Sequence, residues 1–429
     1  MTIENLYKIF LQQKFQFTTD TRKINSGDIF FALKGEKFNA NEFTQQALNA
    51  GAAYVVVDEN GFVLNEKCIL VDDVLQCLQQ LANHHRKQFS IPVIAIGGSN
   101  GKTTTKELVS KVLSEKYRVY TTFGNFNNHI GVPITLLKMP MNTEIAVIEI
   151  GANHLLETKR LCEIAEPNFG LITNNGKDHL EGFGNIEGVK KANAELFDYL
   201  KIIDGTAFVN ASDIDLKTAS VGLQQIFYSD SLQVGCFGSI KKSFPFLEAE
   251  IKINEEKFSL QSQLSGNYNL INIIAASCVG SYFGVSSSQI KNAVENYKPA
   301  NNRSQWVEKN GNNFIVDCYN ANPSSMKLAL ESFAQLPLEN KIPILGDMFE
   351  LGNHSQFEHQ QIIQLLQNLK FAKVILVGNE FAKTENRPTS FLCFENHQAV
   401  KNWLYENQFQ QHTFLLKGSR GMTLEKIVE

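Results

Sequence analysis

A glycine-rich loop that joins an apolar run to a helix-patterned segment is the feature that most constrains the fold of this chain. The apolar run covers residues 91–96, and the helical periodicity covers 102–116. Around the junction the chain reads Ala95-Ile96-Gly97-Gly98-Ser99-Asn100-Gly101-Lys102-Thr103-Thr104. In this order, backbone N–H groups and the N-terminus of the helix can surround phosphate oxygens. The loop therefore predicts a nucleotide-binding α/β domain, although Ala95 stands where the strict pattern has glycine.

Two side chains of this loop carry the expected chemistry. Lys102 can reach the β and γ phosphates of a nucleotide, and the Thr103 hydroxyl can bind magnesium. A glycine turn without any ligand is the alternative, and the Gly-Lys-Thr order in register argues against it. The residues expected to contact the nucleotide here are Ser99, Asn100, Gly101, Lys102, Thr103 and Thr104.

Polar residues also interrupt or follow the next two predicted strands. The apolar run 145–150 contains Glu149, and a buried carboxylate is costly unless it is paired or bound to a metal. The run 169–173 leads into a polar segment with His179, which either binds metal or phosphate or is simply solvated. Because ligands of open α/β sheets bind at the carboxyl ends of the strands, both are candidates for a metal site. A buried salt bridge is the alternative for Glu149.

Asparagine is clustered in two segments. One cluster lies in residues 124–133, and the other follows Asp317 at the end of an expected strand. Their amide groups suit amide or sugar ligands, whereas a plain loop and a helix-capping turn are the alternatives. The candidate binding residues are Asn125, Asn127 and Asn128 in the first cluster, and Tyr319, Asn320 and Asn322 in the second.

Alternating strand-like and helix-like segments predict an α/β protein of three domains at 1–88, 89–300 and 301–429. At roughly 150 residues per domain, the length of 429 residues fits this number. The central domain is expected to hold a doubly wound, mostly parallel sheet. Period-two alternation over 224–264 adds an antiparallel appendage, with a hairpin turn at 254–257. The third domain is expected to be Rossmann-like, with strands at 314–316, 342–345, 374–377 and 414–416.

Composition restricts the partners and the compartment. Forty Lys and Arg against 44 Asp and Glu leave a formal charge of −4, so no general surface for nucleic acid is expected. The seven scattered cysteines include no C-x-x-C pair, which indicates reduced thiols. No window approaches the roughly 18 apolar residues of a membrane span, and the N-terminal residues do not resemble a signal peptide. We therefore expect a cytoplasmic protein without an integral membrane segment.

An ordered series of motifs over nearly the whole chain resembles the Mur ligase family of peptidoglycan synthesis. The matching stretches begin at Asp20, Gly27, Gly101, Gly124, His179, Gly266, Arg303, Asp317, Leu345 and Lys417. The Tyr-Asn-Ala-Asn-Pro and Gly-Asp-Met-Phe-Glu-Leu-Gly sequences in the last part are similar to the branch that adds D-alanyl-D-alanine. A lone phosphate loop would be weak evidence, whereas this order is specific.

The resemblance implies a ligase that uses ATP and Mg²⁺ to join D-alanyl-D-alanine to UDP-N-acetylmuramoyl-tripeptide through an acyl phosphate, and we expect a monomer. It implies catalytic roles for Lys102, His179, Asn193 and Arg303. Beyond the loop, it implies nucleotide contacts from Asn269, Asn272, Arg303 and Asp317, and metal contacts from Thr103, Glu149 and His179. It implies substrate contacts from Thr21, Arg22, Lys34, Gly35, Asn125, Asn127, Asn128, Tyr319, Asn320 and Asn322.

One position departs from the family pattern. Many relatives have a lysine a little after the His-Leu-Glu segment that is carbamylated and helps to hold a metal, and Asn193 stands at that place. An asparagine cannot be carbamylated, although its amide oxygen is a neutral ligand for a hard cation. Lys190, one helical turn earlier, is the alternative anchor. The sequence therefore predicts an activity that does not depend on bicarbonate.

Two other functions remain open from the sequence. One is another amide ligase of the superfamily, of the third-residue-adding or folylpolyglutamate synthase type, which the stretches that begin at Asp317 and Leu345 disfavour. The other is a nucleotide-binding homologue that has lost catalysis, which the retained Lys102, Glu149 and His179 disfavour. Whether the tripeptide ends in lysine or diaminopimelate does not follow from any motif.

Overall fold

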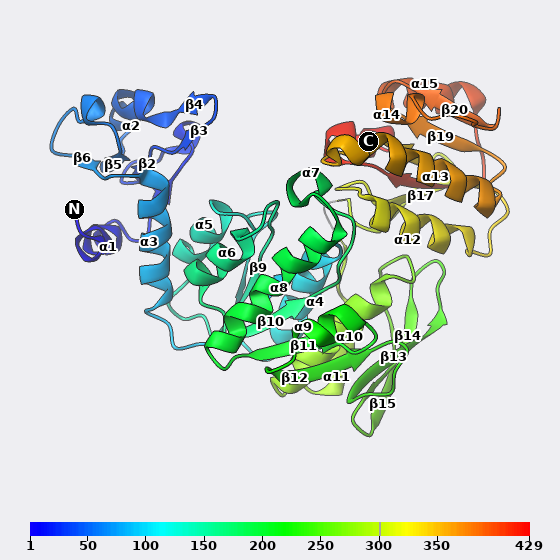
Figure 1. The fold of residues 1–429 in the computed structure, drawn as a ribbon, viewed down its shortest axis with the longest axis horizontal. Coiled ribbons are helices and arrows are strands. Elements are labelled where there is room, and N and C mark those ends of the chain that lie inside the picture. The colour runs from blue at the N-terminus through cyan, green and yellow to red at the C-terminus, as the bar shows by residue number, and fades with distance from the viewer. Residues whose placement is uncertain (300–301) are drawn as a thin grey trace. The chain divides into compact units, whose positions relative to one another are not determined.

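Strands and helices alternate through most of the computed structural model, which describes residues 1–299 and 302–429 (Figure 1). The boundary expected between the second and third domains, at 300/301, lies outside the described residues, and the three-domain division stays a prediction. The chain divides into two compact units. The first comprises Met1–Ala95, Arg118–Ile150 and Lys159–Asn168, and the second comprises Ile96–Tyr117, Gly151–Thr158 and Phe169–Glu429.

The first unit begins with a small parallel sheet in the order β1-β2-β5-β6, drawn in blue in Figure 1. The apolar runs within residues 28–33, 53–58 and 68–71 form its last three strands. Phe30 and Val55 pack against Ala47 of the second helix, because that helix covers one face of the sheet. The elements are α1 (Ile3–Gln12), β1 (Phe17–Thr18), β2 (Ile29–Phe31), β3 (Lys34–Gly35), β4 (Phe38–Asn39), α2 (Thr44–Asn49), β5 (Tyr54–Val57), β6 (Cys68–Leu70) and α3 (Val74–Arg86).

A nine-stranded sheet follows in the order β15-β14-β13-β12-β11-β10-β7-β9-β8. The chain leaves β7, forms β8 and β9 on one side, and then forms β10 to β12 on the other, so the carboxyl end of β7 is a topological switch point. β7 and β9 are buried at every position, as strands covered on both faces are. The first six strands are β7 (Val93–Gly97), β8 (Val119–Thr121), β9 (Ile145–Glu149), β10 (Phe169–Ile172), β11 (Thr206–Asn210) and β12 (Gln224–Ser229).

The antiparallel appendage consists of β13 (Cys236–Lys242), β14 (Glu248–Ile253) and β15 (Glu256–Gln261). Its hairpin turn begins at the predicted residue, Asn254, which has a φ of 53°, but covers only residues 254–255, because residues 256 and 257 already pair with β14. The appendage begins later than expected, since β12 runs parallel to both β11 and β13. Period-two alternation indicates that one face of a strand is buried and the other exposed, but it does not indicate whether the strand is parallel or antiparallel to its neighbours.

A six-stranded sheet in the order β16-β17-β21-β18-β19-β20 completes the second unit. Only β16 is antiparallel to its neighbour among the described strands of this sheet, which agrees with the predicted Rossmann-like arrangement. Successive residues such as Ile344 and Leu345 enter different cores on the two faces. The elements are β16 (Gln305–Lys309), β17 (Asn312–Val316), α12 (Pro323–Ala334), β18 (Lys341–Gly346), α13 (Ser355–Leu369), β19 (Val374–Val377), α14 (Asn379–Ala382), β20 (Phe391–Phe394), α15 (His397–Asn407) and β21 (Thr413–Lys417).

Eight further helices connect these strands. They are α4 (Lys102–Leu113), α5 (Gly131–Leu137), α6 (Glu157–Ala165), α7 (Leu180–Phe183), α8 (Ile186–Ile202), α9 (Ile214–Ala219), α10 (Asn269–Tyr282) and α11 (Ser287–Glu295). α10 is buried along most of its length because it packs against α4 and the strands near it. Among the described residues, no helix combines the length and apolar character needed to cross a membrane.

Candidate active site

The loop between β7 and α4 follows a backbone path that requires glycine at two positions. Gly98 has a φ of +112° and Gly101 a φ of +82°. A Cβ on Gly101 would lie 2.9 Å from Oδ1 of Asn272, and a Cβ on Gly98 would overlap the hydroxyl of Thr173. α4 begins directly after this loop, so the N–H groups of its first turn have no acceptor within the helix. This glycine-shaped path at a helix N-terminus fits a bound phosphate.

Lys102 lies at the same loop. Its Nζ donates to the carbonyl oxygens of Gly98 at 2.5 Å and Ser99 at 3.1 Å. The ammonium group is therefore held at the loop where the phosphates are expected, and its contact with them stays a prediction.

Residues 174–178, here called the bridging loop, fix the phosphate loop. Ser99 donates its backbone N–H to the carbonyl oxygen of Asn174 at 3.0 Å and its hydroxyl to Oδ1 of Asp178 at 2.6 Å. The N–H of Asn100 donates to Oδ1 of Asn174 at 3.2 Å. Two of the predicted nucleotide-binding residues are thus positioned by side chains that follow β10.

His179 follows the bridging loop and has a φ of 46°. Its Nδ1 lies 2.6 Å from Oε2 of Glu350, and the hydrogen bond from His179 lowers the pKa of that carboxyl group. The carbonyl oxygen of Glu350 also accepts the N–H of Glu181 at 3.1 Å. With Nδ1 donating to a carboxylate, Nε2 is the ring nitrogen left to bind a ligand.

Glu149 and the first asparagine cluster meet within the first unit. Glu149 ends β9 and is only 1% exposed. Its Oε1 accepts from Nδ2 of Asn127 at 2.8 Å, and its backbone N–H donates to the hydroxyl of Thr122 at 2.9 Å. Asn128 instead accepts the N–H of Gly131 at the start of α5, at 2.8 Å, while Asn125 is exposed. Of the three asparagines, Asn127 is the one that the structure brings to the predicted metal ligand.

Asn193 on α8 contacts the bridging loop. Its Nδ2 donates to Oδ1 of Asn175 at 2.9 Å. Nζ of Lys190 lies 2.9 Å from Glu187 and 3.0 Å from Asp215, and hydrogen bonds to these two carboxylates raise its pKa. Carbamylation requires a neutral amine, so the pairing disfavours the alternative in which Lys190 takes over the family's lysine role.

Asp317 directly follows β17 and is held by a buried cation. Its Oδ2 lies 2.7 Å from Nζ of Lys417, whose side chain is 3% exposed. Tyr268 at the start of α10 donates to the same oxygen at 3.5 Å, and the N–H of Ser304 donates to Oδ1 at 3.3 Å. Burial and the nearby carboxylate raise the pKa of Tyr268. Asp317, predicted to contact the nucleotide, thus links β17 and β21 to α10.

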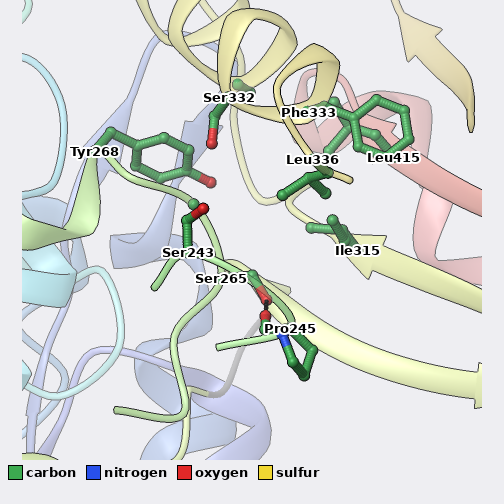
Figure 2. Close-up of a pocket in the computed structure, with 11 residues that line it drawn as sticks. Ser243, Pro245, Ser265, Tyr268, Ile315, Ser332, Phe333, Leu336 and Leu415 are labelled. Carbon is green, nitrogen blue, oxygen red and sulfur yellow. Dashed lines mark hydrogen bonds between the residues drawn. The ribbon is translucent and has the colours of Figure 1, made fainter. Parts of the chain in front are cut away.

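A cavity of about 10 Å³ lies beside Tyr268 (Figure 2). Figure 2 shows the hydroxyl groups of Ser243 and Ser332 with apolar side chains such as Phe333 and Leu415 around it. A space of this size holds about one water molecule. It is therefore too small for a peptide or a nucleotide.

Two arginines flank Tyr319 and make the turn after β17 locally positive. Cζ of Arg303 lies 3.5 Å from the centre of the Tyr319 ring, and Cζ of Arg420 lies 5.1 Å from it. Arg420 also donates to the Tyr319 hydroxyl at 3.4 Å. Arg303 is the predicted residue here, and Arg420 increases the same local charge.

Asn322 serves as a helix cap and also reaches the phosphate loop. Its Oδ1 accepts the N–H of Ser325 at 2.8 Å and so caps α12. Its Nδ2 donates to Oδ1 of Asn100 at 2.8 Å. Asn320 accepts the N–H of Ala321 at 2.9 Å within the turn. The capping alternative is therefore correct for Asn322, and it does not exclude a role at the site.

The other two predicted asparagines support the phosphate loop from α10. Asn272 accepts from the Thr105 hydroxyl at 3.1 Å through Oδ1 and donates to Oδ1 of Asn269 at 3.0 Å. Asn269 donates to the carbonyl oxygen of Ser265 at 2.7 Å. Both side chains are buried, and Asn272 lies against Gly101.

The predicted uridine-nucleotide residues lie in the first unit. Arg22 makes two 2.9 Å hydrogen bonds to Asp20, which lower the pKa of that carboxyl group to about 2. Lys34 lies 3.0 Å from Asp58 and is exposed on a hairpin with Gly35. Thr21 begins the 3₁₀ turn that contains Arg22. These contacts leave both cations at the surface of the unit, where an anionic ligand can reach them.

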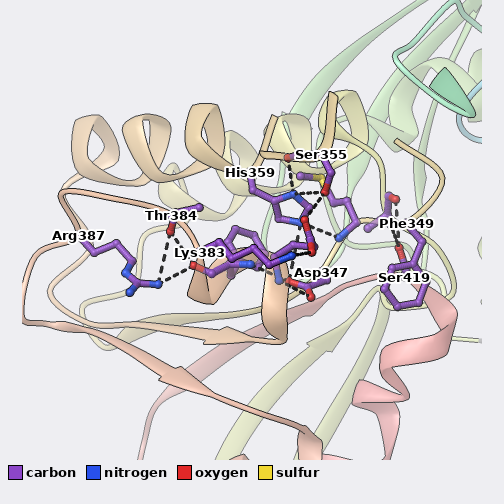
Figure 3. Close-up of polar contacts among 12 residues, drawn as sticks. Asp347, Phe349, Ser355, His359, Lys383, Thr384, Arg387 and Ser419 are labelled. Carbon is purple, nitrogen blue, oxygen red and sulfur yellow. Dashed lines mark hydrogen bonds and ion pairs between the residues drawn. The ribbon is translucent and has the colours of Figure 1, made fainter. Parts of the chain in front are cut away.

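The Gly-Asp-Met segment after β18 forms a structural network (Figure 3). The carboxylate of Asp347 accepts the N–H groups of Glu380 and Phe381, both at 2.9 Å. Nε2 of His359 accepts the N–H of Met348 at 3.0 Å, and its Nδ1 donates to the carbonyl oxygen of Ser355 at 2.7 Å. The motif thus fixes α14 and α13 at the end of β18.

The donor set fits Mg²⁺ only in part. No cluster of three or more His, Cys, Asp or Glu side chains suited to a metal occurs among residues 1–299 and 302–429. Mg²⁺ binds through one or two protein oxygens together with phosphates and water, and Thr103 and Glu149 supply such oxygens. The nitrogen of His179 suits softer cations better. Thr103 and Glu149 belong to different units, so their sharing of one ion stays a proposal.

Several residues that shape the site escaped prediction. Asn174, Lys177 and Asp178 lie in the polar run after β10, of which only His179 was selected. Glu350 lies in a recognised motif but had no assigned partner. The run itself was the available signal, since successive polar residues beyond a strand end mark a ligand-binding edge.

The fold and the site together define a phosphate-loop α/β protein with two compact units. Residues 96–280 match the Mur ligase middle domain, and residues 302–420 match the Mur ligase, glutamate ligase domain. The UDP-N-acetylmuramoyl-tripeptide–D-alanyl-D-alanine ligase of Bacillus subtilis is 35% identical, over 96% of this chain and 92% of that protein. The chain belongs to the Mur ligase family.

Solved structures agree with this assignment. A crystal structure of MurF from Acinetobacter baumannii superposes with a TM-score of 0.89 at 30% identity, covering 96% of this chain and 92% of that one. The MurF ligase from Thermotoga maritima, solved in complex with ADP, gives a TM-score of 0.86 at 26% identity, covering 96% of each chain. The α/β fold class predicted from the sequence is confirmed.

Proposed function

We propose that this chain is an ATP-dependent ligase that joins D-alanyl-D-alanine to UDP-N-acetylmuramoyl-tripeptide and releases ADP and phosphate. The Bacillus subtilis relative bears the name of this activity, and the Thermotoga maritima structure contains ADP. The observation that carries the proposal is the 2.8 Å hydrogen bond from Asn322 to Asn100. It joins the turn that distinguishes the D-alanyl-D-alanine branch to the phosphate loop.

The chemistry requires an activated acyl group. A carboxylate is a poor acyl donor, so the γ-phosphoryl group of ATP first converts it into an acyl phosphate, and the amine then displaces phosphate. In this scheme Lys102 and the N-terminus of α4 offset the charge of the phosphoryl group during its transfer. Arg303 and the turn of residues 319–322 position the incoming dipeptide and the nucleotide.

We assign Mg²⁺ to Thr103 and Glu149, with His179 as a third contact. Bound there, the ion would neutralise phosphate charge, while Asn127 orients Glu149 and Glu350 orients His179. Asn193 takes the place of the carbamylated lysine as a neutral group. We assign the uridine nucleotide to Thr21, Arg22, Lys34 and Gly35, and the remaining substrate contacts to Asn125, Asn127, Asn128, Tyr319, Asn320 and Asn322.

Phosphate release from the purified protein tests the proposal. We expect release with Mg²⁺, ATP, UDP-N-acetylmuramoyl-tripeptide and D-alanyl-D-alanine together, and loss of release when any one of them is omitted. Mass spectrometry of the product should show the pentapeptide. Release without D-alanyl-D-alanine would overturn the proposal, and no release in any mixture would favour a nucleotide-binding homologue. Parallel reactions with the lysine and diaminopimelate tripeptides identify the preferred substrate.

We further infer a monomer that acts in the cytoplasm. Its proposed substrates are ATP and a uridine nucleotide, which are intracellular molecules. The seven cysteines of the described chain are free thiols, which suits a reducing compartment. Sedimentation at several protein concentrations tests the monomer, because a concentration-dependent mass would contradict it.

A further inference from the structure

An ion pair joins the bridging loop to α13. Nζ of Lys177 lies 2.6 Å from Oε1 of Glu358, whose side chain is 6% exposed. The backbone N–H of Lys177 donates to the hydroxyl of Ser324, in the first turn of α12, at 2.8 Å. A carboxylate as buried as that of Glu358 is costly without a charged or hydrogen-bonded partner. This contact therefore depends on the positive charge of Lys177 as well as on the length of its side chain.

The same loop holds the phosphate loop through neighbouring residues. Asn174 and Asp178 accept hydrogen bonds from Ser99 and Asn100 at 2.6–3.2 Å. The bridging loop thus connects two structures. Its residues 174 and 178 bind the nucleotide loop, and its residue 177 binds α13 and the first turn of α12, the helix that follows the turn of residues 319–322.

We propose that Lys177 and Glu358 are positioning residues for the ligation, which act as a clamp that sets α12 and its N-terminal turn against the phosphate loop. Asn322 ends that turn and contacts Asn100, so a displaced α12 would move it away from the nucleotide loop. Neither residue has an assigned contact with a substrate. This inference rests on the proposed function, because the turn is the part of the site assigned to the dipeptide.

Steady-state kinetics with single and double variants test the clamp. We expect Lys177→Met and Glu358→Gln each to raise the KM for D-alanyl-D-alanine by about tenfold, a typical size for residues in one ion pair. The double variant should be no worse than the poorer single variant. Lys177→Arg, which keeps the charge, should retain most of the wild-type KM. The affinity for ADP, measured by calorimetry, should stay unchanged in all of them.

Lys327→Met is the matched control. Lys327 lies on α12, the helix that the clamp holds, and pairs with Glu331 at 3.9 Å, but its side chain is 61% exposed. Its KM should therefore equal that of the wild type. An unchanged KM in both clamp variants would overturn the proposal, and so would additive effects in the double variant or an equal loss of ADP affinity.

Hydrogen–deuterium exchange separates this inference from the proposed function. Peptides that cover residues 174–178 and 322–326 should exchange faster in Glu358→Gln than in the wild type, whichever substrate the enzyme uses. Unchanged exchange there would overturn the clamp. If the wild type does not use D-alanyl-D-alanine but the variant exchanges faster, the proposed function fails and the clamp remains.

Discussion

Lys102 is the cation of the phosphate loop, and its ammonium group contacts the carbonyl oxygens of Gly98 and Ser99. Lys102→Ala should lower the rate of phosphate release by about 10²–10³-fold, as loss of a single charge-stabilising group does. Thermal unfolding of the variant should change little, because the side chain is only partly buried. Lys111→Ala, at the exposed far end of the same helix, is the control. Retention of activity in Lys102→Ala would show that the Lys102 side chain is not needed for phosphoryl transfer.

Asn193 makes a second residue-scale prediction. Its amide hydrogen-bonds to Asn175, and Lys190 is engaged by Glu187 and Asp215, so neither offers a neutral amine for carbon dioxide. Initial rates should therefore be the same in bicarbonate-free buffer and with added bicarbonate. Activation by bicarbonate would contradict this assignment and would redirect attention to Lys190.

The sequence predicts local geometry best. The conformation of Gly101 and the position of Lys102 in the loop follow from the loop pattern itself, whereas their roles toward a nucleotide stay predictions. Glu350 and Glu358 were not predicted, because their partners His179 and Lys177 lie far away in the sequence, and no local pattern encodes such a pair. Asn272 was selected from the sequence as a nucleotide contact. In the structure it contacts Gly101 and Thr105 and so also supports the phosphate loop, a role that the sequence did not indicate.

At the scale of elements, Asn322 at the N-terminus of α12 both caps the helix and contacts the phosphate loop. Asn322→Asp keeps an oxygen for the N–H of Ser325 but removes the donor to Asn100. It should lower the ligation rate with little loss of stability. Asn322→Ala removes both contacts, and the lost cap should also cost about 1 kcal/mol of unfolding free energy.

Asn396→Ala is the control for this comparison. Asn396 caps α15 by accepting the N–H of Ala399 at 3.0 Å, and it has no assigned role at the site. It should lose stability and keep activity. Chemical denaturation and phosphate release, measured on the three variants, separate capping from contact with the phosphate loop. Full activity of Asn322→Asp would show that the Asn100 contact is dispensable.

Elements with a strong buried pattern were predicted closely. β19 matches its expected range of 374–377, because continuous apolar runs mark strands covered on both faces. β16 and β20 were missed, since each lies at an edge of its sheet and includes partly exposed positions. Edge strands carry a weak pattern, and their pairing depends on a neighbour that the local sequence does not specify.

At the scale of the whole molecule, a chain with a formal charge of −4 is proposed to bind two anionic substrates. The net negative charge of the protein repels these substrates, so their binding must depend on local cationic side chains and on Mg²⁺. ATP with Mg²⁺ should therefore raise the melting temperature. At a hundredfold excess of ligand over Kd, the free energy of unfolding should increase by about 2.7 kcal/mol. The same ATP with EDTA should give a much smaller shift. Equal shifts would contradict the assigned metal dependence.

Each unit also contains a buried histidine. In the first unit, Nε2 of His85 donates to the carbonyl oxygen of Met139 at 3.2 Å, so its Nδ1 accepts from the Tyr7 hydroxyl at 2.9 Å. In the second unit, His359 is held by Met348 and Ser355. Burial lowers the pKa of both histidines. Both rings are therefore neutral in the folded protein at pH values where an unfolded histidine begins to take up a proton.

This arrangement fixes the sign of a pH dependence in both units. Below the unfolded pKa of about 6.5, the unfolded chain binds protons that the folded chain does not, so stability falls as the pH falls. Each histidine contributes at most about 1.4 kcal/mol per pH unit in this range and nothing well above it. Calorimetry from about pH 7.5 to about pH 5.5 should show a smaller loss in His85→Gln and in His359→Gln than in the wild type. If the stability of a variant depends on pH in the same way as that of the wild type, the replaced histidine has the same pKa in the folded and unfolded states, which would contradict the prediction. The His85 variant tests the first unit, and the His359 variant tests the second.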